Sequence, residues 1–219
     1  MKNLLLKEFK LCFLPINYIF LIFAVMLIIP NYPCYVSFFY LLLNTFWIFK
    51  NGDLNKDLQY SLILPIRKSD IVKARVMSVA IYEIVFFILS IPFAILNHKL
   101  VPQGNNAGIN SNFAFYGLVM IVLTISRFCF FTIYYKKAEK HEKPLVVSFV
   151  VYFVIYFIFE CPIWMIKTGK LQAFTFLDKV DMASLIMQLP ILVFGIIFYI
   201  LGFILTYKVS AKEFEKVNL

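Results

Sequence analysis

Three ionisable side chains interrupt the long apolar stretches of this 219-residue sequence: Glu83, Arg127 and Glu160. Burying a charge in an apolar stretch is costly, so such a residue is expected to pair with another charge or to contact a ligand. If the stretches are helices, Glu83 lies about 10–12 Å beyond the start of its stretch and Arg127 about 10–12 Å before the end of its own. Since successive membrane helices run in opposite directions, both residues lie at the same depth from one side. Their equal depth predicts an ion pair, which would either hold two helices together or contact a substrate. Glu160 lies towards the opposite end, where it would face a path through the domain or reach the polar boundary.

The sequence contains no recognisable catalytic constellation. No Gly-x-x-x-x-Gly-Lys-Ser/Thr loop occurs, so any ATP hydrolysis is expected in another chain. The two histidines, His98 and His141, lie between the apolar stretches and form no His-Glu-x-x-His arrangement. The four cysteines occur singly, without metal-ligand spacing, and either Cys34 and Cys161 form a disulfide or they are simply small apolar side chains. We expect no catalytic residue, no metal and no cofactor in this chain.

Composition predicts that the elements positioning these residues are membrane helices. Hydrophobic residues make up 62% of the chain and charged residues 15%, against about half and a quarter in an ordinary soluble protein. The apolar residues form continuous blocks without the alternation of a β-barrel, and a block of about 20 residues crosses a hydrocarbon core about 30 Å thick. We predict an all-α integral membrane protein with one domain over residues 1–219. Its six spans would lie at about 11–29, 32–49, 76–96, 113–135, 145–166 and 185–207.

The distribution of basic residues predicts that both termini lie in the cytoplasm, because short cytoplasmic loops retain Lys and Arg. Sixteen basic residues fall on one side of the predicted membrane and four on the other. The sixteen are Lys2, Lys7, Lys10, Lys50, Lys56, Arg67, Lys68, Lys73, Arg75, Lys136, Lys137, Lys140, Lys143, Lys208, Lys212 and Lys216, and the four are Lys99, Lys167, Lys170 and Lys179. Contact with anionic lipid explains the net charge of +9, so no nucleic-acid partner is expected.

Residues 1–13 have the pattern of an amphipathic helix lying at the membrane interface. On a helical wheel the apolar side chains fall opposite the polar ones: Leu5, Phe9, Cys12 and Phe13 against Asn3, Lys7 and Lys10. The basic residues would then face lipid phosphates. The alternative is a frayed extension of the first span.

The inner stretch 50–75 is the longest cytoplasmic loop and has the pattern of ordered structure. Asn51-Gly52 favours a turn, Asp53 can cap a helix, and leucines at 54, 58 and 62 repeat along one face. Pro65 ends that helix, and a second helix would continue unbroken from Asp70 to Leu96, about 40 Å by the standard rise. A short helix held on such a stem would either dock a cytosolic partner or pack against lipid headgroups.

Two loops are predicted on the outer side. The stretch 98–112 contains Pro, Gly and several Asn residues and is expected to be irregular. The stretch 167–184 mixes apolar residues with two aspartates. It is expected to hold a short helix that lies on or dips into the outer leaflet.

Residues 62–75, Leu-Ile-Leu-Pro-Ile-Arg-Lys-Ser-Asp-Ile-Val-Lys-Ala-Arg, resemble the signature of type-2 ATP-binding cassette (ABC) permeases. In that family a short helix precedes Leu-Pro-apolar, a basic or Ser residue, Ile-Val and a basic residue. The amphipathic amino end and the six-span plan extend the resemblance loosely over the whole chain. It implies that residues 53–64 form a coupling helix seated in a groove of a separate ATPase subunit, which would bind ATP and magnesium. The coupling residues would be Asp53, Leu54, Asp57, Leu58, Ser61, Leu62, Pro65 and Arg67.

The size, basicity and Phe-rich spans are also similar to the small permeases of the staphylococcal phenol-soluble modulin exporter. This implies a subunit of an exporter in the bacterial plasma membrane that moves amphipathic peptides or other hydrophobic cargo. A second permease subunit, identical or a sister, would complete it. Lantibiotic-immunity permeases share much of this description, and a membrane protein that binds a toxin without transporting it is a further class. A membrane enzyme is disfavoured because the catalytic constellation is missing.

Overall fold

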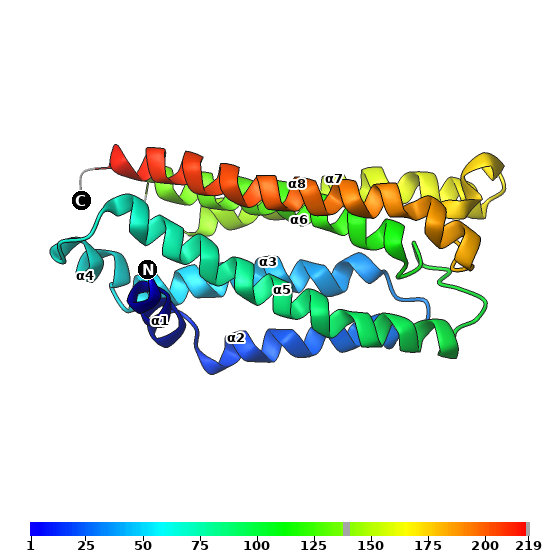
Figure 1. Cartoon of the computed structure of the whole chain (residues 1–219), viewed down its shortest axis with the longest axis horizontal. Helices are drawn as coiled ribbons and strands as arrows, with labels where there is room; N and C mark the ends of the chain where they lie inside the picture. Colours follow the sequence, from blue (N-terminus) through cyan, green and yellow to red (C-terminus); the bar gives the residue numbers. More distant parts are fainter. Residues whose placement is uncertain (138–140, 218–219) are drawn as a thin grey trace.

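The computed structural model describes residues 1–137 and 141–217, and within these residues the regular structure is entirely helical. Lys140, one of the sixteen predicted cytoplasmic basic residues, lies outside the described residues. The molecule is elongated, and α1, α4 and both chain ends lie at the same end of it (Figure 1). The elements are α1 (Lys2–Leu11), α2 (Pro15–Ile19), η1 (Phe20–Ile28), α3 (Cys34–Leu54), α4 (Asp57–Ile63), α5 (Lys68–Leu100), α6 (Phe113–Lys137), α7 (Glu142–Lys167), η2 (Gln172–Leu177) and α8 (Met182–Glu215).

Among the residues that the structure describes, four helices are long and apolar enough to cross a membrane: α5, α6, α7 and α8. A fifth candidate is the pair formed by α1 and the continuous segment Pro15–Ile28, which are bent by 90° at their junction. The helix α3 does not reach the same hydropathy, because Asn44, Lys50 and Asn51 dilute its apolar residues. The structure therefore supports an all-α membrane protein with four or five such segments, fewer than the six spans predicted.

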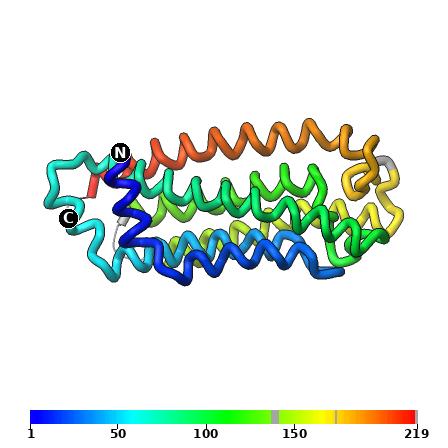
Figure 2. The backbone as a smooth tube through the Cα atoms, turned by 60° about the horizontal axis from the view of Figure 1, so that its bottom comes forward, coloured from blue at the N-terminus to red at the C-terminus, as the bar shows by residue number. Residues whose placement is uncertain are grey.

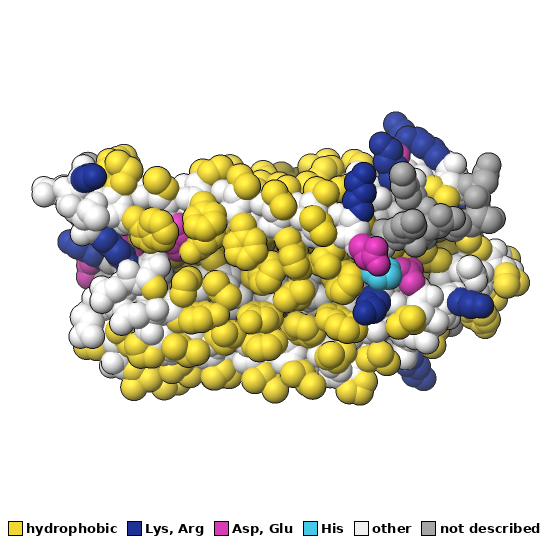
Figure 3. Space-filling model, turned by 180° about the vertical axis from the view of Figure 1, so that it is seen from behind, with side chains coloured by type: hydrophobic (Ala, Val, Ile, Leu, Met, Phe, Trp, Pro, Cys, Tyr) yellow, Lys and Arg dark blue, Asp and Glu magenta, His cyan; other side chains and the backbone are white. Residues whose placement is uncertain are grey.

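The surface has the distribution expected of a membrane domain. Hydrophobic side chains cover the middle of the molecule, and charged side chains gather near its two ends (Figure 3). The end that carries the two termini is the end that the basic residues assign to the cytoplasm. We refer to it as the inner end and to the opposite end as the outer end.

The helix predicted over residues 1–13 is present as α1 and lies across the long axis of the bundle (Figure 2). A buried amide cluster stabilises the bend that follows it. Asn51 Nδ2 donates to the Cys12 carbonyl oxygen at 3.1 Å, and Asn17 Nδ2 donates to Asn44 Oδ1 at 2.8 Å. The prediction of a turn at Asn51-Gly52 was wrong, because this asparagine serves the bend from within α3, which continues to Leu54.

The short helix predicted in the inner stretch 50–75 is present as α4, but it is shorter than predicted and begins later. It spans Asp57–Ile63, and its N-cap is Lys56, whose φ of 51° places the backbone in the left-handed region. Asp53 therefore does not cap it and lies in the last turn of α3. The following stem, α5, has 33 residues and is about 50 Å long at 1.5 Å per residue, so it extends the predicted stem at both ends.

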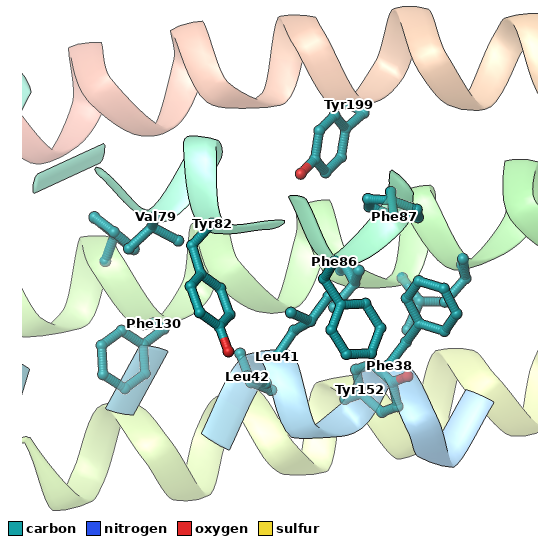
Figure 4. Close-up of a cluster of buried hydrophobic side chains, with 14 of the residues drawn as sticks. Phe38, Leu41, Leu42, Val79, Tyr82, Phe86, Phe87, Phe130, Tyr152 and Tyr199 are labelled. Carbon is teal, nitrogen blue, oxygen red and sulfur yellow. The ribbon is translucent and has the colours of Figure 1, made fainter. Parts of the chain in front are cut away.

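Aromatic side chains from most of the long helices form the core. Phe38 of α3 lies 5.2 Å from Phe86 and 5.5 Å from Phe115 between ring centroids, both in edge-to-face contact. Figure 4 shows Phe38, Tyr82, Phe86 and other rings converging between the helices. Many of the Phe and Tyr residues therefore stabilise the bundle, and their abundance alone does not identify a cargo path.

The helices α6 and α8 pack with their backbones in close contact. A Cβ atom added at Gly117 would lie 2.5 Å from the carbonyl oxygen of Ile191, and one added at Gly195 would collide with the backbone of Gly117. Small residues allow this close approach between membrane helices. Two of the last three long helices, α6 and α8, are thus in tight backbone contact.

The outer loops are ordered by side-chain hydrogen bonds. The irregular loop predicted over 98–112 is shorter in the structure, because 98–100 belong to α5; residues 101–112 are irregular, yet Asn105, Asn110 and Asn112 are buried in them. Asn110 Nδ2 donates to the Asp178 carbonyl oxygen at 2.6 Å, which joins this loop to the segment before α8. The short 3-10 helix η2 lies within the predicted outer segment 167–184. Cys34 is buried and Cys161 is exposed, and both are free thiols, so the disulfide considered from the sequence does not form.

Candidate functional site: a buried ion-pair junction beneath the cytoplasmic helix

The predicted coupling residues divide into two groups in the structure. Asp57, Leu58 and Ser61 are buried against the bundle. The others lie outside that inward face: Leu54, Pro65 and Arg67 are exposed, and Asp53 and Leu62 are half-buried. The inward group contacts a cluster of charged side chains, and the exposed group lies on the surface of the inner end.

Arg75 of α5 is the centre of the inward cluster. Its Nη2 donates to Asp57 Oδ2 of α4 at 2.8 Å, and its Nε donates to Glu8 Oε2 of α1. Nη2 also lies 3.1 Å from the Sγ of Cys12. Arg75, Asp57 and Glu8 are all essentially inaccessible to solvent. One guanidinium thus connects the cytoplasmic helix, the amphipathic amino-terminal helix and the stem helix.

Lys7 balances the charge of the cluster. Its Nζ lies 2.8 Å from Asp57 Oδ1 and donates to Ser61 Oγ at 2.7 Å. Two cations, Lys7 and Arg75, therefore face two carboxylates, Glu8 and Asp57. Removing one member of such a buried set leaves an uncompensated charge, which costs about 3–5 kcal/mol. The inward position of Lys7 contradicts the prediction that it faces lipid phosphates.

The end of α3 is shaped to accept the guanidinium. A Cβ atom at Gly52 would lie 3.0 Å from Arg75 Nη2, and the ring centroid of Phe49 lies 4.9 Å from Arg75 Cζ. A glycine leaves room for the planar group, and the aromatic face attracts it. We call Lys7, Glu8, Cys12, Asp57 and Arg75 the inner junction.

Glu8, Cys12 and Asp57 also offer ligand atoms within 4.8 Å of one another, a spacing that could hold a metal ion. Both carboxylates are already paired with Arg75 or Lys7, so a divalent ion would have to displace the guanidinium. Burial raises the pKa of the Cys12 thiol to about 12, so the thiol keeps its proton at neutral pH. Metals bind the thiolate, so the arrangement favours an ion-pair junction over a metal centre.

Asp53, one of the predicted coupling residues, belongs to a separate contact at the inner end. Tyr134 Oη of α6 donates to Asp53 Oδ1 at 2.5 Å, and His141 Nδ1, next to α7, lies 2.9 Å from Asp53 Oδ2. This carboxylate connects the end of α3 to the second half of the bundle. Neither of these two hydrogen bonds joins Asp53 to α4.

The predicted ion pair between Glu83 and Arg127 is present within the bundle. Arg127 Nη1 donates to Glu83 Oε2, which also accepts a hydrogen bond from Tyr199 Oη at 2.5 Å. The Arg127 Cζ lies 3.4 Å from the ring centroid of Phe203. The pair therefore connects α5 of the first half to α6 and α8 of the second half. Nothing in the geometry assigns it a substrate.

Glu160 lies apart from that pair, near the outer end, and is fully buried. Its Oε1 accepts a hydrogen bond from the Ile109 backbone N–H at 3.3 Å, and a Cβ at Gly108 would lie 2.6 Å from the same oxygen. The side chain therefore contacts the outer loop and does not reach the boundary, contrary to one of the two predicted positions.

Sequence reasoning missed Glu8. The signal for it is present in the sequence, because Glu8 occupies the i, i+4 row between Leu4 and Cys12 on the apolar side of the amino-terminal helix. A carboxylate in that row requires a buried partner. Arg75 was counted as a topology-setting residue, although it supplies that partner.

Comparison with known proteins gives one family. The model of the family described as "ABC-2 family transporter protein" matches residues 3–215. No curated protein matches the chain, and no solved structure matches it.

Proposed function

Since the chain belongs to the ABC-2 transporter family, we propose that it is one of two membrane permease subunits of an exporter powered by a separate cytosolic ATPase. The family itself implies a membrane permease subunit, a partner ATPase and a lipid bilayer. In our proposal six segments cross the bilayer: Pro15–Ile28, α3, α5, α6, α7 and α8. Two of the three polar side chains that lower the hydropathy of α3 are buried, and each makes a hydrogen bond: Asn44 accepts one from Asn17, and Asn51 donates one to the Cys12 carbonyl oxygen. The third, Lys50, lies near the inner end of α3, with its Nζ 4.5 Å from the ring centroid of Trp47. ATP and magnesium would be bound by the partner.

The observation that carries the coupling proposal is an apolar patch at the cytoplasmic tip. Leu54 is 71% exposed, Tyr60 57% and Ile63 83%, and Leu64 adjoins them. The helix α4 lies at the inner extremity of the molecule (Figure 1). Apolar patches that face water mark protein interfaces. We call Leu54, Tyr60, Ile63 and Leu64 the tip patch and propose that it sits in a groove of the ATPase.

This assignment revises the coupling residues inferred from the sequence. Leu54 stays in the docking set, and Tyr60, Ile63 and Leu64 join it. Asp57, Leu58 and Ser61 act behind it, because they face the bundle. A movement imposed on the tip patch would be carried by Asp57 to Arg75 of α5 and, through Lys7, to α1.

The cargo we propose is amphipathic or hydrophobic, with peptides such as phenol-soluble modulins as the first candidates. The support is the resemblance of the sequence to small peptide-exporter permeases together with an apolar membrane domain that holds few intramembrane charges. An immunity permease or a non-transporting toxin-binding protein would share both properties. An export assay with amphipathic peptides, in host cells with and without this chain, separates these roles. Loss of export on deletion supports the exporter, and toxin sensitivity without loss of export supports the immunity role.

Purification of the tagged chain from its native host tests the ATPase partnership. We expect a P-loop ATPase to be retained. Loss of an interface hot spot costs at least about 2 kcal/mol, close to 30-fold in affinity, so Tyr60→Glu and Ile63→Glu should each remove most of the retained ATPase. Gln59→Glu is the matched control, because Gln59 is exposed on α4 outside the tip patch. Retention of the ATPase by both patch variants, or its absence from the wild-type purification, would contradict the proposal.

A further inference from the structure

A furrow runs between α5 and α8 at membrane depth. It consists of two cavities of about 440 and 480 Å³ that adjoin at the shared lining residues Phe87, Ile91 and Met120. On α5 its lining extends from Ala80 to His98, which is about 27 Å at 1.5 Å per residue. This length is close to the hydrocarbon core, about 30 Å thick. The furrow follows the membrane normal for most of the bilayer.

Two rows of isoleucine form the sides of the furrow. On α5 they are Ile84, Ile88, Ile91 and Ile95, and on α8 Ile196, Ile200 and Ile204. Met120 of α6 and the rings of Phe87 and Tyr199 complete the lining. Ile88 is 61% exposed and Ile200 54%, so the furrow opens sideways out of the bundle.

The shape follows from the course of the helices. α5 and α8 lie close together near the inner end and diverge towards the outer end (Figures 1 and 2). At the middle they touch, because the ring centroids of Phe87 and Tyr199 are 5.7 Å apart. A helix with its side chains is about 10 Å across or more and would not fit between α5 and α8 at this point. A single hydrocarbon chain is the size of occupant that the furrow admits.

The chemistry of the lining points to the same class of ligand. On α5 the lining is apolar from Ala80 to Ile95, and the hydroxyls of the lining residues Tyr116 and Tyr199 bond to Ser90 and Glu83. The other polar side chains, His98, Ser111 and Asn112, lie at the outer end, where Asn112 donates to the Leu177 and Lys179 carbonyl oxygens. Because the furrow opens laterally at membrane depth, hydrocarbon chains are the molecules available to fill it. We propose that it binds one acyl chain of an outer-leaflet phospholipid, with the headgroup at the outer end beside the half-buried His98.

Such a lipid would fill the gap between α5 of the first half and α8 of the second. It would stabilise the bundle beside the Glu83–Arg127 pair, because Tyr199 both lines the furrow and donates to Glu83. The proposal requires only that the chain lies in a membrane. It does not depend on the ATPase partnership, so the two can fail separately.

The full-length chain, reconstituted in phosphatidylglycerol vesicles that contain a trace of phospholipid with a diazirine in its acyl chain, allows a direct test. After irradiation, labelled residues are mapped by mass spectrometry. We expect several-fold more label on Ile88, Ile91 and Ile200 than on Val150 and Val154 of α7, which are similarly exposed outside the furrow. Equal labelling of α5, α8 and α7 would show annular lipid only and would overturn the proposal. Weak labelling of α5 together with α5–α5 cross-links between copies would assign the furrow to a second chain and would also overturn it.

The second measurement is the lipid labelling of a variant whose furrow is filled by a larger side chain. Ala94 lines the outer cavity and is buried, so Ala94→Phe should occupy the space and reduce the labelling of α5 and α8 to the level of α7. Val150→Phe adds the same ring outside the furrow and should leave the labelling unchanged. If Ala94→Phe fails to fold, the comparison of helices in the wild-type chain still decides the question.

Discussion

Replacing Arg75 with methionine tests whether the inner junction holds the cytoplasmic end together. Methionine keeps much of the length and apolar character of the arginine stem and removes the guanidinium. Glu8 and Asp57 would then share one cation, Lys7, in a fully buried site. Leaving a buried charge uncompensated costs about 3–5 kcal/mol. At about 2–4 °C per kcal/mol for a chain of this size, the unfolding midpoint should fall by roughly 6–20 °C.

A compensating substitution separates lost charge balance from lost packing. Arg75→Met combined with Glu8→Gln leaves Lys7 facing Asp57, so the junction is neutral again, and the double variant should recover more than half of the loss. Lys10→Met removes one positive charge from an exposed position of α1 and serves as the control. Unfolding in detergent can be followed with a thiol-reactive dye, because Cys12 and Cys34 are buried and become reactive on unfolding.

The result that would refute this reasoning is specific. If Arg75→Met unfolds at the temperature of Lys10→Met, the buried ion pairs contribute no stability. If the double variant is less stable than Arg75→Met alone, charge balance is not what the guanidinium provides, and the packing of Arg75 on Phe49 would be the remaining source.

Three further predictions concern the rest of the bundle. Glu83→Arg or Arg127→Glu alone places two like charges in a buried pair and should abolish the monodisperse peak in size-exclusion chromatography, whereas the exchanged double variant should restore it; absence of rescue would argue against a direct pair. Gly195→Leu should lower the unfolding midpoint by the equivalent of at least about 1–3 kcal/mol, because it forces α6 and α8 apart, while Ile197→Leu on the exposed face of α8 should be neutral. Gly52→Val should lower the same midpoint, because its side chain would displace the Arg75 guanidinium; a wild-type midpoint would show that the space at Gly52 is not needed.

The sequence predicted features that depend on depth and composition. Glu83 and Arg127 pair because each lies about the same number of helical turns from the inner boundary, and rise per residue converts sequence position into depth. The apolar blocks correspond to α5, α6, α7 and α8 for a similar reason, since a continuous apolar run long enough to cross the bilayer leaves few alternatives.

Features that depend on tertiary partners were not predictable in the same way. Asn51-Gly52 favours a turn by local propensity, but the Cys12 carbonyl oxygen and the Arg75 guanidinium supply tertiary contacts that hold these two residues in α3. The helix α4 begins at Asp57, and its buried face consists of Asp57, Leu58 and Ser61, so Leu58 is the one buried residue of the predicted leucine row. Lys7 turned inward because Asp57, 50 positions later in the chain, lies beneath α1.

The stem helix α5 carries one residue of each of the two charged clusters. Arg75 and Glu83 are eight residues apart on it, about 12 Å along the axis and roughly 80° around it at 100° per residue. Arg75 therefore faces α1 and α4, whereas Glu83 faces α6 and α8. A helix cannot change the angle between two of its faces without breaking backbone hydrogen bonds. In the coupling mechanism we propose, a displacement of α4 that reaches Arg75 would rotate or tilt α5, and the same movement would act on Arg127 and Tyr199. In this proposal α5 connects the inner junction to the Glu83–Arg127 pair. It thereby connects α4 to the second half of the bundle.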